Sequence, residues 1–395
     1  NRTDRKYTDA VKKSIVGAAS VEDLHAALLK TVDGAATPDI LPPGAMLLQP
    51  SEERRRSGSH YTPRSLTEPI VRTTLEPILA RLEGPDGRSP TPDELLDLKI
   101  CDPAMGSGAF LVETCRQLGD ALVAAWKEHG EIPELPSDED EVVFARRMVA
   151  QRCLYGVDRN PVAVDLAKVS LWLVTLARDH ALTFLDHALR HGDSLLGLTK
   201  RQLLHFHWDE DASGQQAGLE AMAIQEQIDR VSELRERIRT AGENIADDRL
   251  RSLWNEVQSE TSELRLYADL VALAFLEGEN AQAREARRGE YASAVAGGLA
   301  ERHRQRLASL RDDDPPLAPF HWELEFPEVF DRKDGGLDAI VGNPPFAGKN
   351  TLIAGSIKGY PEWLRATNAE SHGNADLVAY FFRRSFDLIR PGGTF

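Results

Sequence analysis

Cysteine is scarce in this sequence, and long apolar runs and an excess of basic residues are missing from it. Its 395 residues include 3 cysteines, Cys101, Cys115 and Cys153, which are too few for a disulfide framework and too scattered for a structural zinc site. The longest apolar stretch, residues 169–177, is roughly half as long as a membrane-spanning helix. These absences argue against a disulfide-rich secreted protein and a membrane protein, and they predict a cytoplasmic location.

The charge balance is acidic. The sequence has 47 basic and 63 acidic residues, and its net charge of -16 argues against a protein that coats nucleic acid over its whole surface. The segment 209–314 alone holds 23 acidic and 14 basic residues, so more than half of the excess is local. The objection to nucleic-acid binding is therefore weaker than the net charge suggests.

The first half of the chain has the pattern of an α/β protein. Residues 1–50 indicate a short helical N-terminal segment. Residues 51–208 alternate short apolar runs, at 98–101, 153–157 and 181–185, with amphipathic runs of helix length. Such alternation is typical of a parallel sheet covered by helices. We expect this part to hold one half of a doubly layered α/β domain.

A different pattern occupies residues 209–314. Apolar residues recur there at close to 3.5-residue spacing, first from Ile224 to Ile245 and then from Leu250 to Val271. The spacing predicts a coiled-coil-like helical hairpin, followed by a third helix at 280–311. Its many charges favour a solvated insertion over an arm that binds a specific partner.

The α/β pattern resumes in residues 315–395. A strand is expected at 337–341 and a helix at 375–389, ending at a turn of Pro391, Gly392 and Gly393. The sequence stops where a further strand is expected. We therefore expect a second half-domain that is incomplete at its C-terminal end.

A strand that turns on glycine marks a candidate ligand site. Residues 98–101 run directly into a turn that contains Asp102, Pro103, Ala104, Gly106 and Gly108. Turning on glycine brings bare backbone to the carboxyl edge of the sheet, because no side chain holds a ligand away. The Gly-Ser-Gly element alone is weak evidence for a cofactor site.

Two further acids strengthen this interpretation. Asp158 ends the next strand-like run and Asp193 follows the third, so both are expected in the same crevice. One carboxylate can accept both hydroxyls of a ribose, and the other can accept from an adenine amino group. Asp102 and Asp158 lie 56 positions apart, whereas dinucleotide-binding units place the acid about 20 residues on, which disfavours NAD. Taken alone, each acid has an alternative role: Asp158 could cap the following helix, and Asp193 could close a turn.

The most specific motif is Asn343-Pro344-Pro345-Phe346, directly after the strand expected at 337–341. Two successive prolines donate no backbone hydrogen bond and hold the preceding carbonyls away from helix or sheet. The Asn343 side-chain oxygen and the Pro344 carbonyl can then accept both hydrogens of one exocyclic amino group, which frees its lone pair for attack on a methyl sulfonium. Phe346 offers a face for stacking an extruded base.

Together these motifs resemble the gamma-class S-adenosylmethionine-dependent N6-adenine DNA methyltransferases. The glycine turn resembles their motif I, Asp158 motif II, Asp193 motif III, and Asn343 to Phe346 motif IV. Further elements of the same order are the motif X-like Gly58-Ser59-His60-Tyr61-Thr62-Pro63 and the motif V-like Asn374-Ala375-Asp376-Leu377. The long insertion is similar to that of type IIG restriction-modification, BREX and DISARM phage-defence methylases, and the type I modification subunit shares the Tyr-Thr-Pro element.

This resemblance implies a Rossmann-like methyltransferase sheet with helices on both faces, S-adenosyl-L-methionine as cofactor, and double-stranded DNA as substrate. It also implies partner subunits of a defence system and no metal. The predicted cofactor-binding residues are Tyr61, Thr62, Asp102, Pro103, Ala104, Gly106, Gly108, Asp158 and Asp193. The predicted catalytic residues are Asn343, Pro344, Pro345 and Phe346. The resemblance also implies a target-recognition domain after these motifs, and we expect that domain to lie outside this chain and to make most of the phosphate contacts.

Two alternatives stay open. Asn-Pro-Pro-aromatic loops also serve enzymes that methylate protein glutamine or RNA amino groups, although the Tyr-Thr-Pro element and the insertion favour DNA. A non-catalytic module that uses a retained cofactor pocket to gate DNA recognition is the other alternative, and the intact Asn343 loop argues against it. His205, His207 and His321 lack the spacing of a metal site and indicate ordinary packing.

Overall fold

Short apolar runs far apart in the chain become neighbouring strands of one parallel sheet. The strand order is β3-β2-β1-β4-β5, and every pairing is parallel. The strands are β1 (Ile100–Asp102), β2 (Leu154–Asp158), β3 (Leu189–His191), β4 (Leu337–Ile340) and β5 (Ile389–Thr394). The chain runs from β1 outward to β3 and then returns to place β4 on the other side of β1, so the direction of strand order reverses between β1 and β4. In open α/β sheets, ligands bind at such a point.

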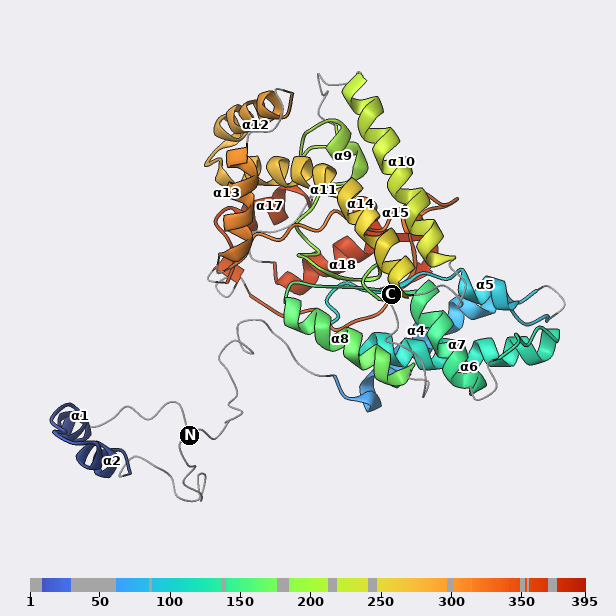
Figure 1. The fold of residues 1–395 in the computed structure, drawn as a ribbon, viewed down its shortest axis with the longest axis horizontal. Helices are drawn as coiled ribbons and strands as arrows, with labels where there is room; N and C mark the ends of the chain where they lie inside the picture. The colour runs from blue at the N-terminus through green and yellow to red at the C-terminus, as the bar shows by residue number, and fades with distance from the viewer. Residues whose placement is uncertain are drawn as a thin grey trace. The chain divides into compact units, whose positions relative to one another are not determined.

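The structure is a computed structural model (Figure 1). It describes residues 9–29, 62–84, 87–135, 140–175, 185–211, 219–240, 247–296, 301–313, 315–348, 352–353, 355–368 and 375–395. Contacts divide the chain into two compact units, Asn1–Ser51 and Glu52–Phe395. The first contains α1 (Asp9–Val16) and α2 (Val21–Leu29).

The larger unit contains the sheet and the remaining helices. They are α4 (Arg64–Leu82), α5 (Pro92–Leu96), α6 (Ala109–His129), α7 (Glu141–Arg152), α8 (Pro161–Val174), α9 (Lys200–Leu204), α10 (Leu219–Arg239), α11 (Asp247–Glu277), α12 (Ala281–Ala296), α13 (Glu301–Asp312), α14 (Trp322–Glu325), α15 (Pro327–Phe330), α17 (Tyr360–Ala366) and α18 (Leu377–Leu388). Among the helices searched in these ranges, none is long and apolar enough to cross a membrane.

Helices cover both faces of the sheet because successive strand residues point to opposite sides. Ile100 and Leu154 pack into one core with α4, α6, α7 and α8. Cys101 and Tyr155, one position on, pack into another core with α14 and α15. Figure 1 shows α4, α6, α7 and α8 gathered on one side of the larger unit and α10 and α11 on the other. This confirms the expected Rossmann-like α/β layering.

The third strand lies later in the chain than predicted. Of the expected run 181–185, only Leu185 lies within the described residues, and it is not in a strand. β3 instead spans Leu189–His191 and pairs with Gly156 to Asp158 of β2. β3 is a short edge strand in which Leu189 alone is buried, so apolar character was a poor guide to its position.

The C-terminal Pro-Gly-Gly element is part of a strand, where a turn was expected. α18 ends at Leu388 and β5 begins at the next residue, taking in Pro391 and Gly392. Two facts make this possible: β5 lies at the edge of the sheet, where proline is tolerated, and its pairing with β4 contains a register shift. Gly392 adopts a φ of 79° inside this irregularity.

The helical insertion is built into the larger unit, in contrast to the solvated arrangement that its charges favoured. α10 and α11 do form a hairpin, and the expected third helix is two helices, α12 and α13. Six successive residues near the end of α11, Leu270 to Phe275, are at most 4% exposed. The Phe275 ring packs edge-on against Trp363 of α17 at 5.2 Å. A helix buried on all sides is a core element.

Buried arginines join the start of the insertion to the sheet. Arg235 of α10 donates two 2.7 Å hydrogen bonds to Glu328 of α15 and one of 2.9 Å to the carbonyl of His187, just before β3. Arg190 of β3 pairs with Glu325 at 2.9 Å. The Trp254 ring of α11 lies under both guanidinium groups. The insertion is therefore held by hydrogen-bonded charges as well as by apolar packing.

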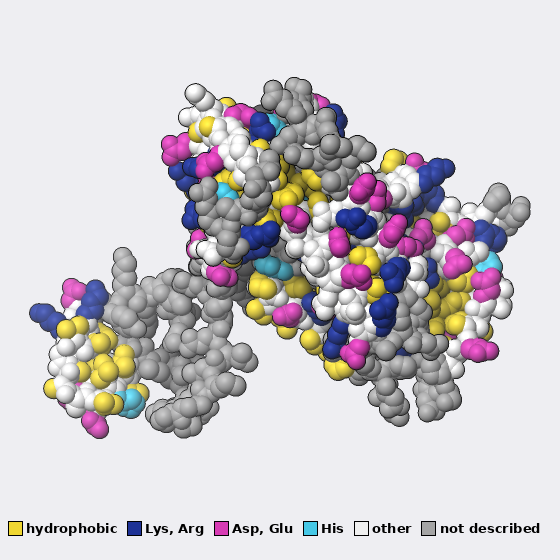
Figure 2. Space-filling view, turned by 45° about the horizontal axis from the view of Figure 1, so that its top comes forward, with side chains coloured by type: hydrophobic (Ala, Val, Ile, Leu, Met, Phe, Trp, Pro, Cys, Tyr) yellow, Lys and Arg dark blue, Asp and Glu magenta, His cyan; other side chains and the backbone are white. Residues whose placement is uncertain are grey.

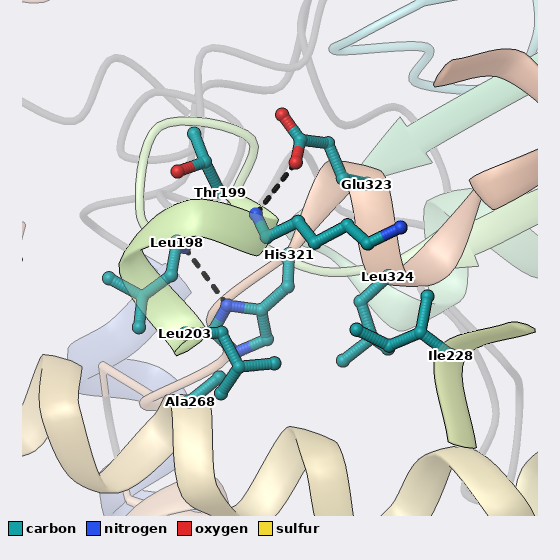
Figure 3. Close-up of a pocket in the computed structure, with 9 residues that line it drawn as sticks. Leu198, Thr199, Leu203, Ile228, Ala268, His321, Glu323 and Leu324 are labelled. Atoms are coloured by element: carbon teal, nitrogen blue, oxygen red, sulfur yellow. Dashed lines mark hydrogen bonds between the residues drawn. The ribbon is translucent and has the colours of Figure 1, made fainter. Parts of the chain in front are cut away.

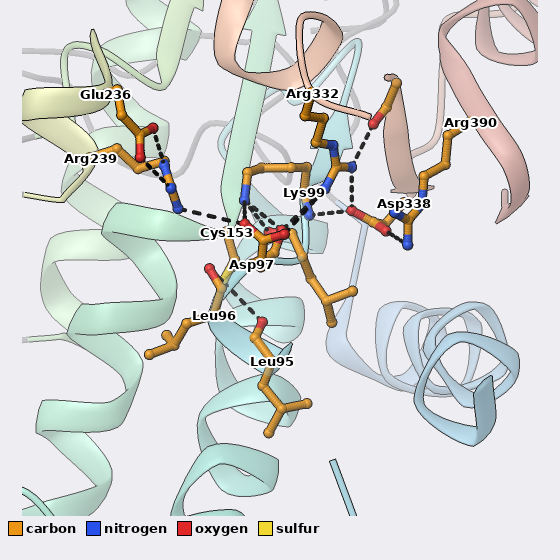
Figure 4. Close-up of polar contacts among 12 residues, drawn as sticks. Leu95, Leu96, Asp97, Lys99, Cys153, Glu236, Arg239, Arg332, Asp338 and Arg390 are labelled. Carbon is orange, nitrogen blue, oxygen red and sulfur yellow. Dashed lines mark hydrogen bonds and ion pairs between the residues drawn. The ribbon is translucent and has the colours of Figure 1, made fainter. Parts of the chain in front are cut away.

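A second charge cluster lies at the amino ends of β1 and β4 (Figure 4). The fully buried carboxylate of Asp338 accepts from the backbone N–H of Lys99 at 2.8 Å and from Arg332 at 2.6 Å, and it also pairs with Arg390. Burial lowers the pKa of the Lys99 ammonium. Arg239, at the end of α10, approaches Asp97 at 3.8 Å. This cluster ties β1, β4 and β5 together at the end of the sheet opposite the glycine turn.

We expect Arg235→Ala to lower the free energy of unfolding by about 3–5 kcal/mol, because it leaves the carboxylate of Glu328 buried without its cation. Urea denaturation measures this loss. Arg287→Ala is the matched control: its pair with Glu290 has the same 2.7 Å distance but is about half exposed on both sides, so its loss costs no more than about 1 kcal/mol. Equal losses in the two variants would contradict the proposed role of the buried pair.

Candidate functional site

The glycine turn after β1 is held by backbone contacts to β2. The N–H of Met105 donates to the carbonyl of Val157 at 3.0 Å, and Gly106 and Gly108 have positive φ of 53° and 80°. A Cβ on Gly108 would lie 3.1 Å from the Cβ of Ala167, so the missing side chain also lets α8 approach the start of α6. The turn therefore brings bare backbone to the carboxyl edge of the sheet, as the sequence predicts.

Asp102 is the most deeply buried acid of this turn. Its side-chain oxygen Oδ1 accepts from the N–H of Ala104 at 3.0 Å, and the residue is 1% exposed. Burial raises the pKa of the Asp102 carboxyl to about 8. The backbone hydrogen bond from Ala104 lowers this pKa, and the nearby carboxylate of Asp158 raises it. A carboxyl with such a pKa takes up and releases a proton near neutral pH.

Asp158 joins the end of β2 to the glycine turn. Its Oδ2 accepts from the N–H of Gly106 at 2.9 Å, and its Oδ1 accepts from the N–H of Asn160 at 2.8 Å. Burial raises the pKa of this carboxyl, while the two backbone donors oppose the shift. Helix capping is left to Asn160, whose side chain accepts from Val162 at the start of α8. Asp158 thus braces the turn that the motif predicts it to serve.

Asp193, after β3, is joined to both the first and the last parts of the site. Its Oδ1 accepts from the N–H of Leu195 at 3.0 Å and from the Tyr360 hydroxyl at 2.9 Å. Its Oδ2 lies 3.9 Å from Nε of Arg159. The neighbouring Ser194 hydroxyl donates to the carbonyl of Pro103 at 2.6 Å, which brings the third strand end against the glycine turn.

The end of β4 lies directly beside Asp102. The N–H of Val341 donates to the carbonyl of Cys101 at 2.9 Å, which continues the pairing of β1 with β4. A Cβ on Gly342 would lie 2.6 Å from Oδ1 of Asp102, so a side chain there would displace the buried Asp102 carboxyl. The Asn343 loop therefore begins in contact with the turn that carries the predicted cofactor residues.

Two side chains of this loop, those of Asn343 and Phe346, are exposed. Phe346 is 72% exposed. The Asn343 amide nitrogen donates to the Thr62 hydroxyl just before α4, at a long 3.5 Å. No donor from the described chain reaches the Asn343 side-chain oxygen or the Pro344 carbonyl. Two acceptor oxygens are thus available at the carboxyl edge of the sheet.

Two residues with clear contacts to this site were not among the predicted site residues, although Asp376 belongs to the motif V-like element. Tyr360, at the start of α17, is buried and orients Asp193. Asp376 caps α18 and accepts from the N–H of Ala347, the residue after Phe346. The signal for Asp376 was visible as an acid one residue before an apolar helix, whereas nothing in the spacing connects Tyr360 with Asp193.

Other sequence features lie elsewhere or serve packing. Tyr61, the motif X-like residues 58–60 and Asn374 fall outside the described residues. His207 pairs with Glu285 and His321 with Asp269, and the searched ranges hold no group of three or more His, Cys, Asp or Glu side chains suited to a metal. Figure 2 shows acidic and basic side chains interspersed on one face of the molecule.

A small cavity in the larger unit is structural. It is lined by residues of α9, α10, α11 and α14 and of the segments just before α9 and α14, and none of the predicted site residues lines it (Figure 3). There the backbone N–H of Leu198 donates to Nδ1 of His321 at 3.0 Å, and the N–H of Lys200 donates to Glu323 at 2.6 Å. The cavity belongs to the packing of α10 and α11 of the insertion against α9 and α14.

Two family models match the chain and together span all of these motifs. The N-6 DNA Methylase model matches residues 46–206, which contain the glycine turn, Asp158 and Asp193. The Eco57I restriction-modification methylase model matches residues 152–395, which contain the Asn343 loop. The chain belongs to the Eco57I restriction-modification methylase family. As a member of this family, it carries the motifs in the order that the sequence predicts.

Two curated relatives support the same assignment. RM.MjaORFECS2P of Methanocaldococcus jannaschii, assigned as a type II restriction enzyme and methyltransferase, is 22% identical over 337 residues, which are 73% of this chain and 28% of the relative. RM.Eco57I of Escherichia coli, a type II restriction enzyme and methyltransferase, is 26% identical over 165 residues, 39% of this chain and 16% of the relative. The chain therefore spans less than a third of the length of either relative.

The raised pKa of Asp102 predicts a pH dependence of stability. The ordinary pKa of an unfolded Asp is about 3.9, so folding favours its protonated form. Its contribution to stability is fully present below about pH 4 and is lost as the pH rises through about 8. Asp102→Asn keeps an acceptor for Ala104 but does not titrate.

Urea unfolding of both proteins between about pH 5 and 8 measures this effect. We expect the stability of the wild-type protein to fall relative to that of Asp102→Asn as the pH rises through this window. Parallel pH profiles for the two proteins would show that Asp102 ionises as freely in the folded chain as in the unfolded one.

Proposed function

We propose that this chain is the methyl-transfer part of an N6-adenine DNA methyltransferase in a restriction-modification system, with S-adenosyl-L-methionine as methyl donor. One observation carries the proposal: the Asn343 loop leaves the sheet in contact with Asp102, and its acceptor oxygens have no donor from the described chain. Family membership supports DNA adenine as the substrate, because the matching families are DNA methylases and restriction-modification methylases.

The carboxyl ends of β1, β2 and β3 fit S-adenosylmethionine. At Gly106 a Cβ would meet no described atom within 4 Å, so a ligand can approach the backbone. Asp158 uses one lone pair on each oxygen for its backbone donors and keeps two for ribose hydroxyls. Asp193 has both lone pairs of Oδ1 occupied, so its Oδ2, beside Arg159, is left for the amino group of an adenine.

The remaining predicted residues complete this pocket. Asp102, Pro103, Ala104 and Gly108 form the glycine turn, and the resemblance assigns Tyr61 and Thr62 to the methionine end of the cofactor. The cofactor supplies a methyl group on a positively charged sulfur. The protein supplies oriented oxygens, a shaped backbone turn and two carboxylates.

Transfer requires the amino nitrogen of adenine to offer its lone pair. Oδ1 of Asn343 and the Pro344 carbonyl each accept one N–H of that amino group, which draws the lone pair out of conjugation with the ring. Pro344 and Pro345 keep the loop from pairing with the sheet, and the exposed ring of Phe346 stacks on the base after it leaves the duplex. After transfer the nitrogen releases one proton to water, since amide and carbonyl oxygens are too weakly basic to keep it.

We expect Asp158→Ala to weaken S-adenosylmethionine binding by about 10- to 100-fold, because the carboxylate gives two charge-assisted hydrogen bonds and braces Gly106. Isothermal titration calorimetry of the protein with the cofactor measures this. Asn343→Ala serves as the control and should bind the cofactor like the wild-type protein. Unchanged affinity of Asp158→Ala would rule out its role in holding the ribose.

We expect Asn343→Ala to abolish methyl transfer, because the amino group then loses one of its two acceptors. The intact gene, wild type or variant, is expressed in cells that lack it, and genomic DNA is analysed by nucleoside mass spectrometry and methylome sequencing. N6-methyladenine at a defined sequence with the wild-type gene supports the proposal. N6-methyladenine in cells with the Asn343→Ala gene would refute the proposal that Asn343 activates the adenine amino group. Methylated RNA or protein glutamine in place of methylated DNA would refute the proposal that DNA is the substrate.

A further inference from the structure

The loop Asn343 to Phe346 is fixed at each end by a different contact. At its start, Val341 pairs with Cys101 and Gly342 lies against Asp102. At its end, Ala347 makes two hydrogen bonds to the beginning of α18: its N–H donates to Oδ1 of Asp376 at 3.0 Å, and its carbonyl accepts from the N–H of Leu377 at 3.0 Å. These bonds close a small ring between the loop and the helix.

Among the described residues, the loop itself makes one further hydrogen bond, the long 3.5 Å contact from the Asn343 amide nitrogen to the Thr62 hydroxyl, which holds the side chain of Asn343 and leaves the Pro344 carbonyl without a contact. Pro344 and Pro345 have no N–H to donate, and Asn343 and Phe346 are exposed. The position of the Pro344 carbonyl thus depends on the two ends. The first end is set by the sheet itself, because β4 pairs with β1, so the second end is the adjustable one.

We propose that Asp376 is a positioning residue for methyl transfer, which holds the Asn343 loop at the angle that its two acceptor oxygens require. The inference rests on the proposed function of that loop. Asp376 does not touch the substrate amino group and acts through Ala347 alone.

The carboxylate of Asp376 suits this role because one oxygen serves both the loop and the helix. Its Oδ1 accepts from Ala347 at 3.0 Å and from Val378, in the first turn of α18, at 3.1 Å. The partial positive charge at a helix N-terminus stabilises the carboxylate in this place. α18 is itself anchored in the core through Tyr380 and Phe381. A rigid helix thus transmits its position to the loop through two hydrogen bonds.

Two substitutions of Asp376 and one matched control separate positioning from helix capping. Asp376→Ala removes both hydrogen bonds of Oδ1, and Asp376→Asn keeps an oxygen that accepts them. Asp140→Ala is the control: Asp140 caps α7 in the same way, accepting from Val142 at 2.9 Å and Val143 at 3.1 Å, and lies outside the site.

The intact gene product is assayed with tritiated S-adenosylmethionine and genomic DNA from cells that lack the gene. The measurements are the single-turnover rate of transfer to DNA at saturating cofactor, the cofactor Kd by calorimetry and the midpoint of thermal unfolding. We expect Asp376→Ala to lower the rate about 100-fold, since a misplacement of about 1 Å costs that much, with the cofactor Kd unchanged. Asp376→Asn should stay within several-fold of the wild-type rate, and both Ala variants should lose similar thermal stability.

Three outcomes overturn the inference. They are a wild-type rate in Asp376→Ala, an equal loss of rate in Asp140→Ala, and a failure of Asp376→Asn to restore transfer. A wild-type protein that binds the cofactor but methylates no DNA counts instead against the proposed function, and the inference that rests on that function falls with it.

Discussion

The pairing of β4 with β1 is the constraint on which the rest of the site depends. It places two motifs that are more than 200 residues apart in the sequence beside each other, with Gly342 against the carboxylate of Asp102. Backbone sheet bonds fix this distance, and such bonds do not vary with side-chain rotamers. A Cβ at position 342 would meet Asp102 Oδ1 at 2.6 Å, so glycine there lets the two motifs approach without a shift of that carboxyl. The contact between the two halves of the site is thus a property of the sheet.

The helical insertion is the second element that brings these halves together. It departs after the glycine turn and the two acids are complete and returns before β4. Along the way its buried face supports α17, where Gly359 packs against the carbonyl of Leu276 and Trp363 against Phe275. α17 in turn carries Tyr360, which holds Asp193. The insertion is therefore linked to the predicted cofactor pocket through a chain of direct contacts.

The sequence predicted best where local chemistry is distinctive. The turn at Gly106 and Gly108, the strand before Asn343 and the α/β layering could be predicted because glycine, proline and alternating burial leave clear patterns. The position of β3 could not be predicted, because its residues Leu189 to His191 are less apolar than the run before them. The Pro-Gly-Gly strand could not either, since its edge position and irregular register come from the whole sheet.

Long-range contacts set the limit of prediction within the site. That Asp158 would accept from Gly106, or Asp193 from Tyr360, is decided by packing between segments that no spacing rule relates. The burial of α11 could have been predicted from the sequence, because residues 264–276 are apolar around nearly the whole helix. The many charges earlier in the insertion obscured this pattern.

The strand order also has a consequence for how the protein is made on the ribosome. β1, β2 and β3 emerge first, and the edge of β1 that β4 covers has no partner of its own until residues 337–340 are synthesised. An unpaired edge is prone to wrong pairing with other chains. The four helices α10 to α13 appear in this interval, and Arg235 and Arg239 reach segments already made. A nascent chain can thus dock α10 on the early strands before its last two strands exist.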